Sequence, residues 1–217
     1  LYTIKCKIMS TARDVVSLHQ TIGLRRFGIR NHSLWLDGHR FVVRGITCGK
    51  VDSKSFDKQV SAAKEQNTTE IIDLFSDGSC SHEELPKLDS HLQKSDEIGR
   101  PTIIRIETET CPSAMPDILC TLANHPSVFI TVIPPSLLPD LENFTLLKGT
   151  MLFAIEVSSE RASPEIPSGI DVAIVQLTNS EPEASWKKPP PYPSTAWNKE
   201  FASQRQECDR LQAVLAN

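Results

Sequence analysis

The segments PTIIRIE, residues 101–107, MPDILCTLANHPS, residues 115–127, and VFITVI, residues 128–133, decide the fold. The first and last are apolar runs of strand length, and the middle one carries apolar residues at helical spacing. A strand, a helix and a second strand that is apolar almost throughout are typical of a parallel sheet covered by helices. These residues therefore predict one strand–helix–strand unit.

The same alternation extends in both directions along the chain. Helical spacing recurs from Phe56 to Lys64 and in HEELPKLDSHLQKSDEIG, residues 82–99. We expect six parallel strands, at about residues 41–46, 70–75, 101–107, 128–133, 150–157 and 170–177. A closed barrel of this kind has eight strands. The predicted fold is therefore α/β, an incomplete or irregular TIM-type β/α barrel.

A small antiparallel β portion is expected before this barrel. Residues 1–8 alternate apolar and polar like a strand, and a second extended stretch covers about residues 14–30. Asp37-Gly38, a turn dipeptide that tolerates positive φ, separates SLWL from RFVVRGI. This pattern predicts a β-hairpin.

The last part of the chain has a different character. Residues 181–197, EPEASWKKPPPYPSTAW, are too rich in proline to continue a helix or an inner strand. Residues 197–215 carry an apolar stripe, which predicts an amphipathic helix that packs on the sheet or binds a partner. Trp186 and Tyr192 fit either stacking on a sugar ring or, as the commoner use of aromatic residues, anchoring an extended segment.

Composition and motifs exclude several classes of function. The 217 residues carry a net charge of -4, which offers no basic surface for nucleic acid, and no apolar run is long enough to span a membrane. The six cysteines contain no C-x-x-C pair, and no glycine-rich phosphate loop is present. We therefore expect no metal and no cofactor. The six histidines are dispersed, and no G-x-S-x-G motif supports an esterase.

Three segments, in the right order, resemble the family 2 glycoside hydrolases, the family of β-galactosidases and β-glucuronidases. The first, GLRRFGIR with SLWLDGHRFVVRGI, resembles the passage from that family's β-sandwich to its first barrel strand. The second, SDEIGRPTIIRIE, resembles the entry into the third barrel strand. The third, NHPSV at residues 124–128, resembles the entry into the fourth barrel strand. The resemblance implies three parts: a β-sandwich remnant at 1–36, a partial barrel at 37–180, and an extended segment with a packing helix at 181–217. It also implies carbohydrate as a partner, and further domains in a longer parent chain.

The departures from this family concern its chemistry. The family's fourth strand ends in Asn-Glu, where the glutamate is the general acid/base, but alignment on NHPSV puts Pro135 and Ser136 there. Neither side chain can protonate a glycosidic oxygen. After the first strand, where the family has polar and histidine residues that line the sugar pocket, this chain has Thr47-Cys48-Gly49. At the end of the second strand, Ile72 stands near the position of the family's arginine. The seventh strand, which carries the family's nucleophile, is not recognisable. No catalytic residue is inherited.

Other carboxylates are candidates for the vacant roles. Asp73, Glu107, Glu109 and Glu156 fall at or near strand ends, where barrel active sites lie, and Arg44 and Arg105 could balance their charge. Alternatively, such acids cap helices or pair with nearby cations. We therefore predict a degenerate, catalytically inactive module that binds carbohydrate or protein or serves a structural purpose. The alternative is a glycosidase with relocated carboxylates, Asp73, Glu107 and Glu156 foremost, or with catalytic parts outside these residues.

Overall fold

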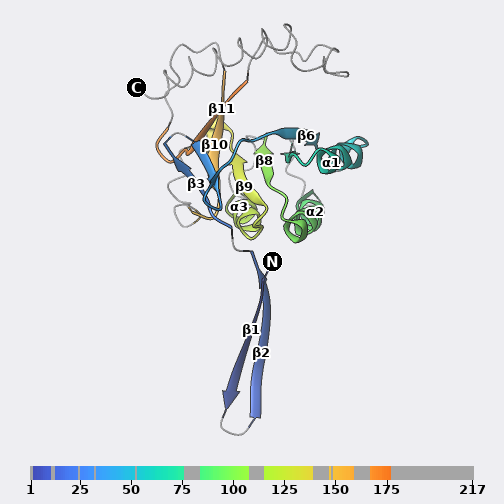
Figure 1. Ribbon diagram of the computed structural model, residues 1–217, viewed down its shortest axis with the longest axis vertical. Coiled ribbons are helices and arrows are strands. Elements are labelled where there is room, and N and C mark those ends of the chain that lie inside the picture. The colour runs from blue at the N-terminus through green and yellow to red at the C-terminus, as the bar shows by residue number, and fades with distance from the viewer. Residues whose placement is uncertain are drawn as a thin grey trace.

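The computed structural model describes residues 2–10, 13–23, 25–31, 33–51, 53–75, 84–107, 115–138, 147, 149–158 and 167–176. These residues form a six-stranded sheet with three helices, a three-stranded sheet and a two-stranded hairpin (Figure 1). The predicted proline-rich segment and final helix, residues 181–217, lie outside the described residues, and so do Glu109, Trp186 and Tyr192.

The six-stranded sheet is parallel throughout and follows chain order. Its strands are β6 (Gly45–Gly49), β7 (Thr69–Leu74), β8 (Thr102–Ile106), β9 (Val128–Val132), β10 (Leu152–Ser158) and β11 (Val172–Gln176). Each strand pairs with its predecessor, so every crossover steps in the same direction. With right-handed crossovers, this order places all helices on one face, as in the wall of a barrel. The predicted α/β class is confirmed, and within the described residues β6 and β11 are the edge strands.

Three helices cover one face of this sheet: α1 (Phe56–Glu65), α2 (Glu84–Ile98) and α3 (Met115–Ala123). Their buried residues are spaced so that they fall on one side of each helix, as in an amphipathic helix. In α3, for example, they are Met115, Ile118, Leu119 and Leu122. We call this side of the sheet the helix face, and its core includes Ile72, Leu74 and Ile104.

The opposite side of the sheet, here called the inner face, carries the intervening residues of each strand. Its core contains Ile103, Phe129, Ile130, Val132 and Ala154. A second sheet of β3 (Phe27–Arg30), β4 (Ser33–Leu36) and β5 (His39–Arg40) supplies apolar side chains that pack against this core. The Phe27 ring stacks on Phe129 with centroids 5.1 Å apart, and Phe41 meets Phe129 edge-on at 5.6 Å.

The predicted turn is confirmed, but the first parallel strand begins later than expected. Asp37 and Gly38 both have positive φ, 49° and 83°, between β4 and β5. The first parallel strand spans Gly45–Gly49, so the predicted 41–46 was wrong for most of its length. The reason is packing: Phe41 and Val43 contact the inner-face core, and ladder pairing with β7 starts only at Gly45.

The N-terminal hairpin, β1 (Tyr2–Ser10) with β2 (Arg13–Ile22), projects from the rest of the molecule (Figure 1). Its register places Cys6 opposite Leu18 and Ile4 opposite Gln20. Tyr2, Ile4 and Leu18 are 60%, 49% and 57% exposed. The strands predicted near residues 1–8 and 14–30 are thus present, but the hairpin adds little to the core.

Candidate functional site

Three strands of the parallel sheet, β7, β8 and β10, bring charged side chains together at the carboxyl end of the inner face. Asp73 lies near the end of β7, Arg105 and Glu107 lie at the end of β8, and Glu156 lies on β10. Side chains alternate along a strand, and the neighbours Ile72, Leu74 and Ile104 point to the helix face. Asp73, Arg105 and Glu156 therefore share the inner face; with Glu107 they form the Arg105 cluster.

Arg105 contacts all three carboxylates of this cluster. The sheet register pairs Arg105 with Asp73. Arg105 Nε donates to Asp73 Oδ1 at 2.7 Å, and Nη2 forms an ion pair with the same oxygen at 2.6 Å. Nε also lies 3.2 Å from Glu107 Oε1. Nη1 reaches across β9 to Glu156 Oε1 at 3.2 Å. The side chain of Asp73 is 12% exposed, whereas those of Glu107 and Glu156 are 34% and 35% exposed, so the two glutamates are accessible to a ligand.

The electrostatics of the cluster centre on Arg105, whose single guanidinium contacts three carboxylates. Burial lowers the pKa of Arg105, but its hydrogen bonds and charge interactions with Asp73 and Glu156 outweigh burial and raise it. Burial and the negative charges of Asp73 and Glu156 raise the pKa of Glu107, although Arg105 opposes them. Glu107 is thus the carboxyl of this cluster that is driven towards its protonated form.

Arg44, Pro135 and Ser136, which the sequence also singled out, lie outside the Arg105 cluster. Arg44 precedes β6, and its carbonyl accepts a bond from the Thr69 amide at the start of β7, so it lies at the opposite end of the strands and does not join the cluster. At the end of β9, Pro135 and Ser136 are exposed in a short helical turn, where the resembled family has its acid/base glutamate.

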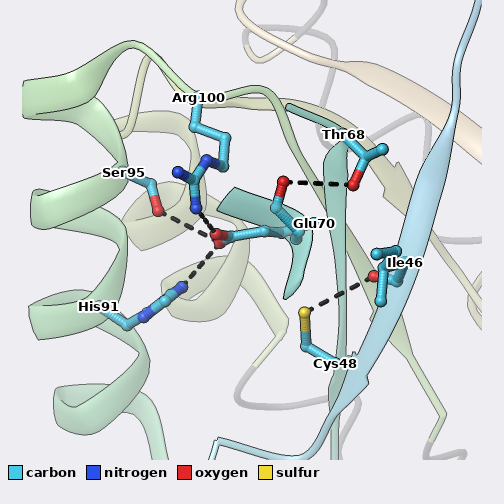
Figure 2. A network of polar contacts seen from close by, with 8 residues as sticks. Ile46, Cys48, Thr68, Glu70, His91, Ser95 and Arg100 are labelled. Carbon is cyan, nitrogen blue, oxygen red and sulfur yellow. Dashed lines mark hydrogen bonds and ion pairs between the residues drawn. The ribbon is translucent and has the colours of Figure 1, made fainter. Parts of the chain in front are cut away.

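A second polar network, which the sequence did not indicate, lies on the helix face (Figure 2). Glu70 of β7 is fully buried and accepts bonds from His91 (2.8 Å), Ser95 (3.4 Å) and Arg100. Burial would raise the pKa of Glu70, but the hydrogen bonds and charges of His91 and Arg100 lower it. We call Glu70, His91, Ser95 and Arg100 the Glu70 network. Its partners are 21 to 30 residues away from Glu70 in sequence, so no local motif could have revealed it.

Two of the segments that resemble the family contact each other directly. Asp96, from SDEIG, accepts a bond from His125 Nδ1 at 2.7 Å and from the Ser127 amide at 2.8 Å, both in NHPSV. Asp89 lies 3.0 Å from His125 Nε2. These contacts fix the turn between α3 and β9, so Asp96 and His125 support the fold and lie outside the Arg105 cluster.

Two general surveys concern only the part of the chain that the structure describes. No group of three or more His, Cys, Asp or Glu side chains there is arranged to hold a metal ion. No helix in that part is both long and apolar enough to cross a membrane.

Comparison with solved structures identifies a similar fold. The chain resembles β-glucuronidase from Ruminococcus gnavus: the complex with D-glucuronic acid at TM-score 0.53 and 15% identity, and the complex with uronic deoxynojirimycin at 0.54 and 15%. Each match covers 81% of this chain and 35% of the glucuronidase chain. That enzyme is a family 2 glycoside hydrolase, the family that the three sequence segments resemble. At this identity the likeness concerns the fold alone.

Neither a protein-family model nor a curated protein matches the sequence. The chain thus has a glycoside hydrolase-like α/β fold and spans about a third of the solved chains that it matches.

Proposed function

We propose that this chain is a degenerate glycoside hydrolase-like module that binds carbohydrate at the Arg105 cluster without hydrolysing it. The observation that carries the proposal is the joining of Asp73, Glu107 and Glu156 through one guanidinium at the carboxyl end of the inner face. In barrel enzymes this end of the strands holds the ligand.

The chemistry of the cluster suits sugar hydroxyls. Carboxylates accept hydrogen bonds from hydroxyl groups, and a guanidinium donates them in a fixed planar fork. Glu107 and Glu156 are about one-third exposed, so a ligand can reach both side chains. Arg105 holds both side chains in place, which reduces the entropy lost on binding.

Two observations favour binding over turnover. Glycosidic cleavage with retention needs two carboxyl groups about 5 Å apart on either side of the scissile bond. Here Glu107 and Glu156 pair with the same guanidinium, through Arg105 Nε and Nη1, so both candidate carboxylates already engage a cation of the protein. At the end of β9, Pro135 and Ser136 supply no proton donor of suitable pKa.

The proposal is tested by calorimetric titration of neutral gluco-, galacto-, manno- and xylo-oligosaccharides. We expect at least one sugar to bind the wild type, and Glu107→Gln and Glu156→Gln each to weaken binding about tenfold, which corresponds to about 1.4 kcal/mol. Glu97→Gln, an exposed acid on α2 at the other end of the strands, is the matched control and is expected to bind normally. Absence of binding to every sugar, or equal binding by all variants, contradicts the proposal.

The alternative is a working glycosidase with relocated carboxylates, favoured by the raised pKa of Glu107 beside a second glutamate. In this case Glu107 is the acid and Glu156 the partner carboxylate. A panel of aryl α- and β-glycosides decides between the two functions. Turnover that disappears in both Glu107→Gln and Glu156→Gln, but persists in Glu97→Gln, establishes the glycosidase and rejects the binding module.

The division into parts is likewise a proposal. We assign residues 1–36 to the end of a β-sandwich, 37–180 to a shortened barrel, and 181–217 to an extended segment with a packing helix. The exposed apolar side chains of the β1–β2 hairpin support the first assignment, since an isolated two-stranded hairpin is only marginally stable. Other domains of a longer chain are the partners that this assignment implies.

A further inference from the structure

A separate cavity lies at the amino ends of the strands, far from the Arg105 cluster. It measures about 290 Å³ and is formed where β6, β7 and β8 begin. Its lining includes Arg44, Arg100 and Asn67 with the apolar side chains of Val42 and Ile98, and none of the described residues that line it is acidic. We call it the Arg44 cavity.

Arg44 is the free charge of this cavity. Its side chain is exposed, and within the described part of the chain it takes part in no hydrogen bond, ion pair or ring contact. Arg100, the other cation in the wall, donates to the buried Glu70. Because the low pKa of Glu70 keeps that carboxylate ionised, the charge of Arg100 is compensated. The cavity wall therefore presents one uncompensated positive charge.

The apolar rim gives the cavity a second property. Val42 and Ile98 are 66% and 59% exposed, so they present apolar surface beside the cation. Phe41 and Pro101 add apolar surface to the lining. A ligand with an apolar body and an anionic group would cover this apolar surface and pair with the Arg44 guanidinium.

We propose that the Arg44 cavity binds a small organic carboxylate whose apolar part rests on Val42 and Ile98. A guanidinium pairs with a carboxylate through two parallel hydrogen bonds, and the single free charge matches a monoanion. Asn67, exposed at the edge of the cavity, carries an amide that donates to the same group. The site is independent of the carbohydrate-binding proposal, because it uses no residue of the Arg105 cluster.

The test compares benzoate with benzamide, which share size and apolar surface but differ in charge. Binding is measured by titration of the wild-type protein, followed through the backbone amide signals of the residues that line the cavity. We expect benzoate to bind about tenfold more tightly than benzamide, a difference of about 1.4 kcal/mol. Equal binding of the two compounds overturns the proposal.

Substitutions at Arg44 locate the effect. Arg44→Gln is expected to reduce benzoate binding to the level of benzamide, and Arg44→Lys to retain only part of the difference, because lysine keeps the charge without the fork. Arg40→Gln is the matched control, since Arg40 is an exposed arginine of β5 outside the lining. Arg44 contributes only its carbonyl to the fold, to Thr69, so its replacement is not expected to unfold the protein. Unchanged binding by Arg44→Gln, or an equal loss in Arg40→Gln, rejects the site.

Discussion

Strand β7 carries two acidic residues, Glu70 and Asp73, that face opposite sides of the sheet in opposite electrostatic settings. Glu70, on the helix face, is fully buried and meets Arg100 and His91 (Figure 2). Asp73, on the inner face, shares Arg105 with two further carboxylates. The carboxylate of Glu70 is enclosed by its partners, whereas Glu107 and Glu156 of the Arg105 cluster are about one-third exposed. Burial of a paired carboxylate is typical of a structural role, whereas the exposure of Glu107 and Glu156 is what the proposed binding of a ligand requires.

The largest effect that distinguishes the two settings is expected from isosteric substitutions on β7. Glu70→Gln leaves the Arg100 charge without its buried partner, and breaking a buried ion pair in this way costs about 3–5 kcal/mol. Asp73→Asn leaves Arg105 in contact with Glu107 and Glu156, so we expect a loss of about 1 kcal/mol or less. Urea unfolding at pH 7 measures both free energies. Equal losses would show that the two carboxylates hold the fold equally and would remove the basis of the comparison.

The sequence predicts those features that depend on residues close together in the chain, and it misses those that depend on contacts between distant residues. The strands and helices follow from local apolar periodicity, and most were predicted within a few residues. Asp73, Glu107 and Glu156 were found because strand ends can be read locally, and the β7–β8 register then explains why Arg105 meets Asp73. That placement carries the proposed function, whose catalytic and binding roles stay predictions.

The features that sequence missed depend on contacts between distant segments. Glu70 stands within the apolar run TTEIIDLF, and its partners His91 and Arg100 are 21 and 30 residues away. Arg44 follows an apolar run that resembles a strand, but Phe41 and Val43 pack on the inner-face core. As a result, Arg44 remains at the amino end of the sheet. In both cases the position of the side chain depends on packing between distant segments, which no local sequence pattern predicts.

The dependence of the unfolding free energy on pH in the acid range gives a second test of the difference between Glu70 and Asp73. The pKa of folded Glu70 is lowered below its ordinary value of 4.5, so its contribution is present above that value and is lost as pH falls through the lower folded pKa. We expect the unfolding free energy of the wild type to fall more steeply below pH 4.5 than that of Glu70→Gln. Parallel pH profiles from urea unfolding would mean that Glu70 is not a stabilising anion.

A third test concerns His125, whose pKa moves in the opposite direction. Burial lowers the pKa of His125, but Asp96 and Asp89 outweigh burial and raise it above its ordinary value of 6.5. Both ring nitrogens face carboxylate oxygens, so the imidazolium donates to both. Its contribution is complete below pH 6.5 and is lost as pH rises through the higher folded pKa. Thermal unfolding between pH 6 and 9 should therefore show declining stability in the wild type. His125→Gln should flatten this decline, while His19→Gln, on the exposed hairpin, should not.

The smallest expected change in unfolding free energy comes from Glu107→Gln. Its sign is expected to be opposite to that of Glu70→Gln, which distinguishes the Arg105 cluster from the Glu70 network. Because the pKa of Glu107 is raised above 4.5, ionisation opposes folding, and stability is lost as pH rises through the folded value. Glu107→Gln should thus leave stability at pH 7 unchanged or raise it by a few tenths of a kcal/mol, since solvent screens this partly exposed group. Urea unfolding of Glu107→Gln and Glu97→Gln in parallel measures the difference. A loss above about 1 kcal/mol in Glu107→Gln alone would make the Arg105 cluster a second structural network. An unchanged or raised value, combined with weakened sugar binding, is what a carboxylate kept for a ligand should show.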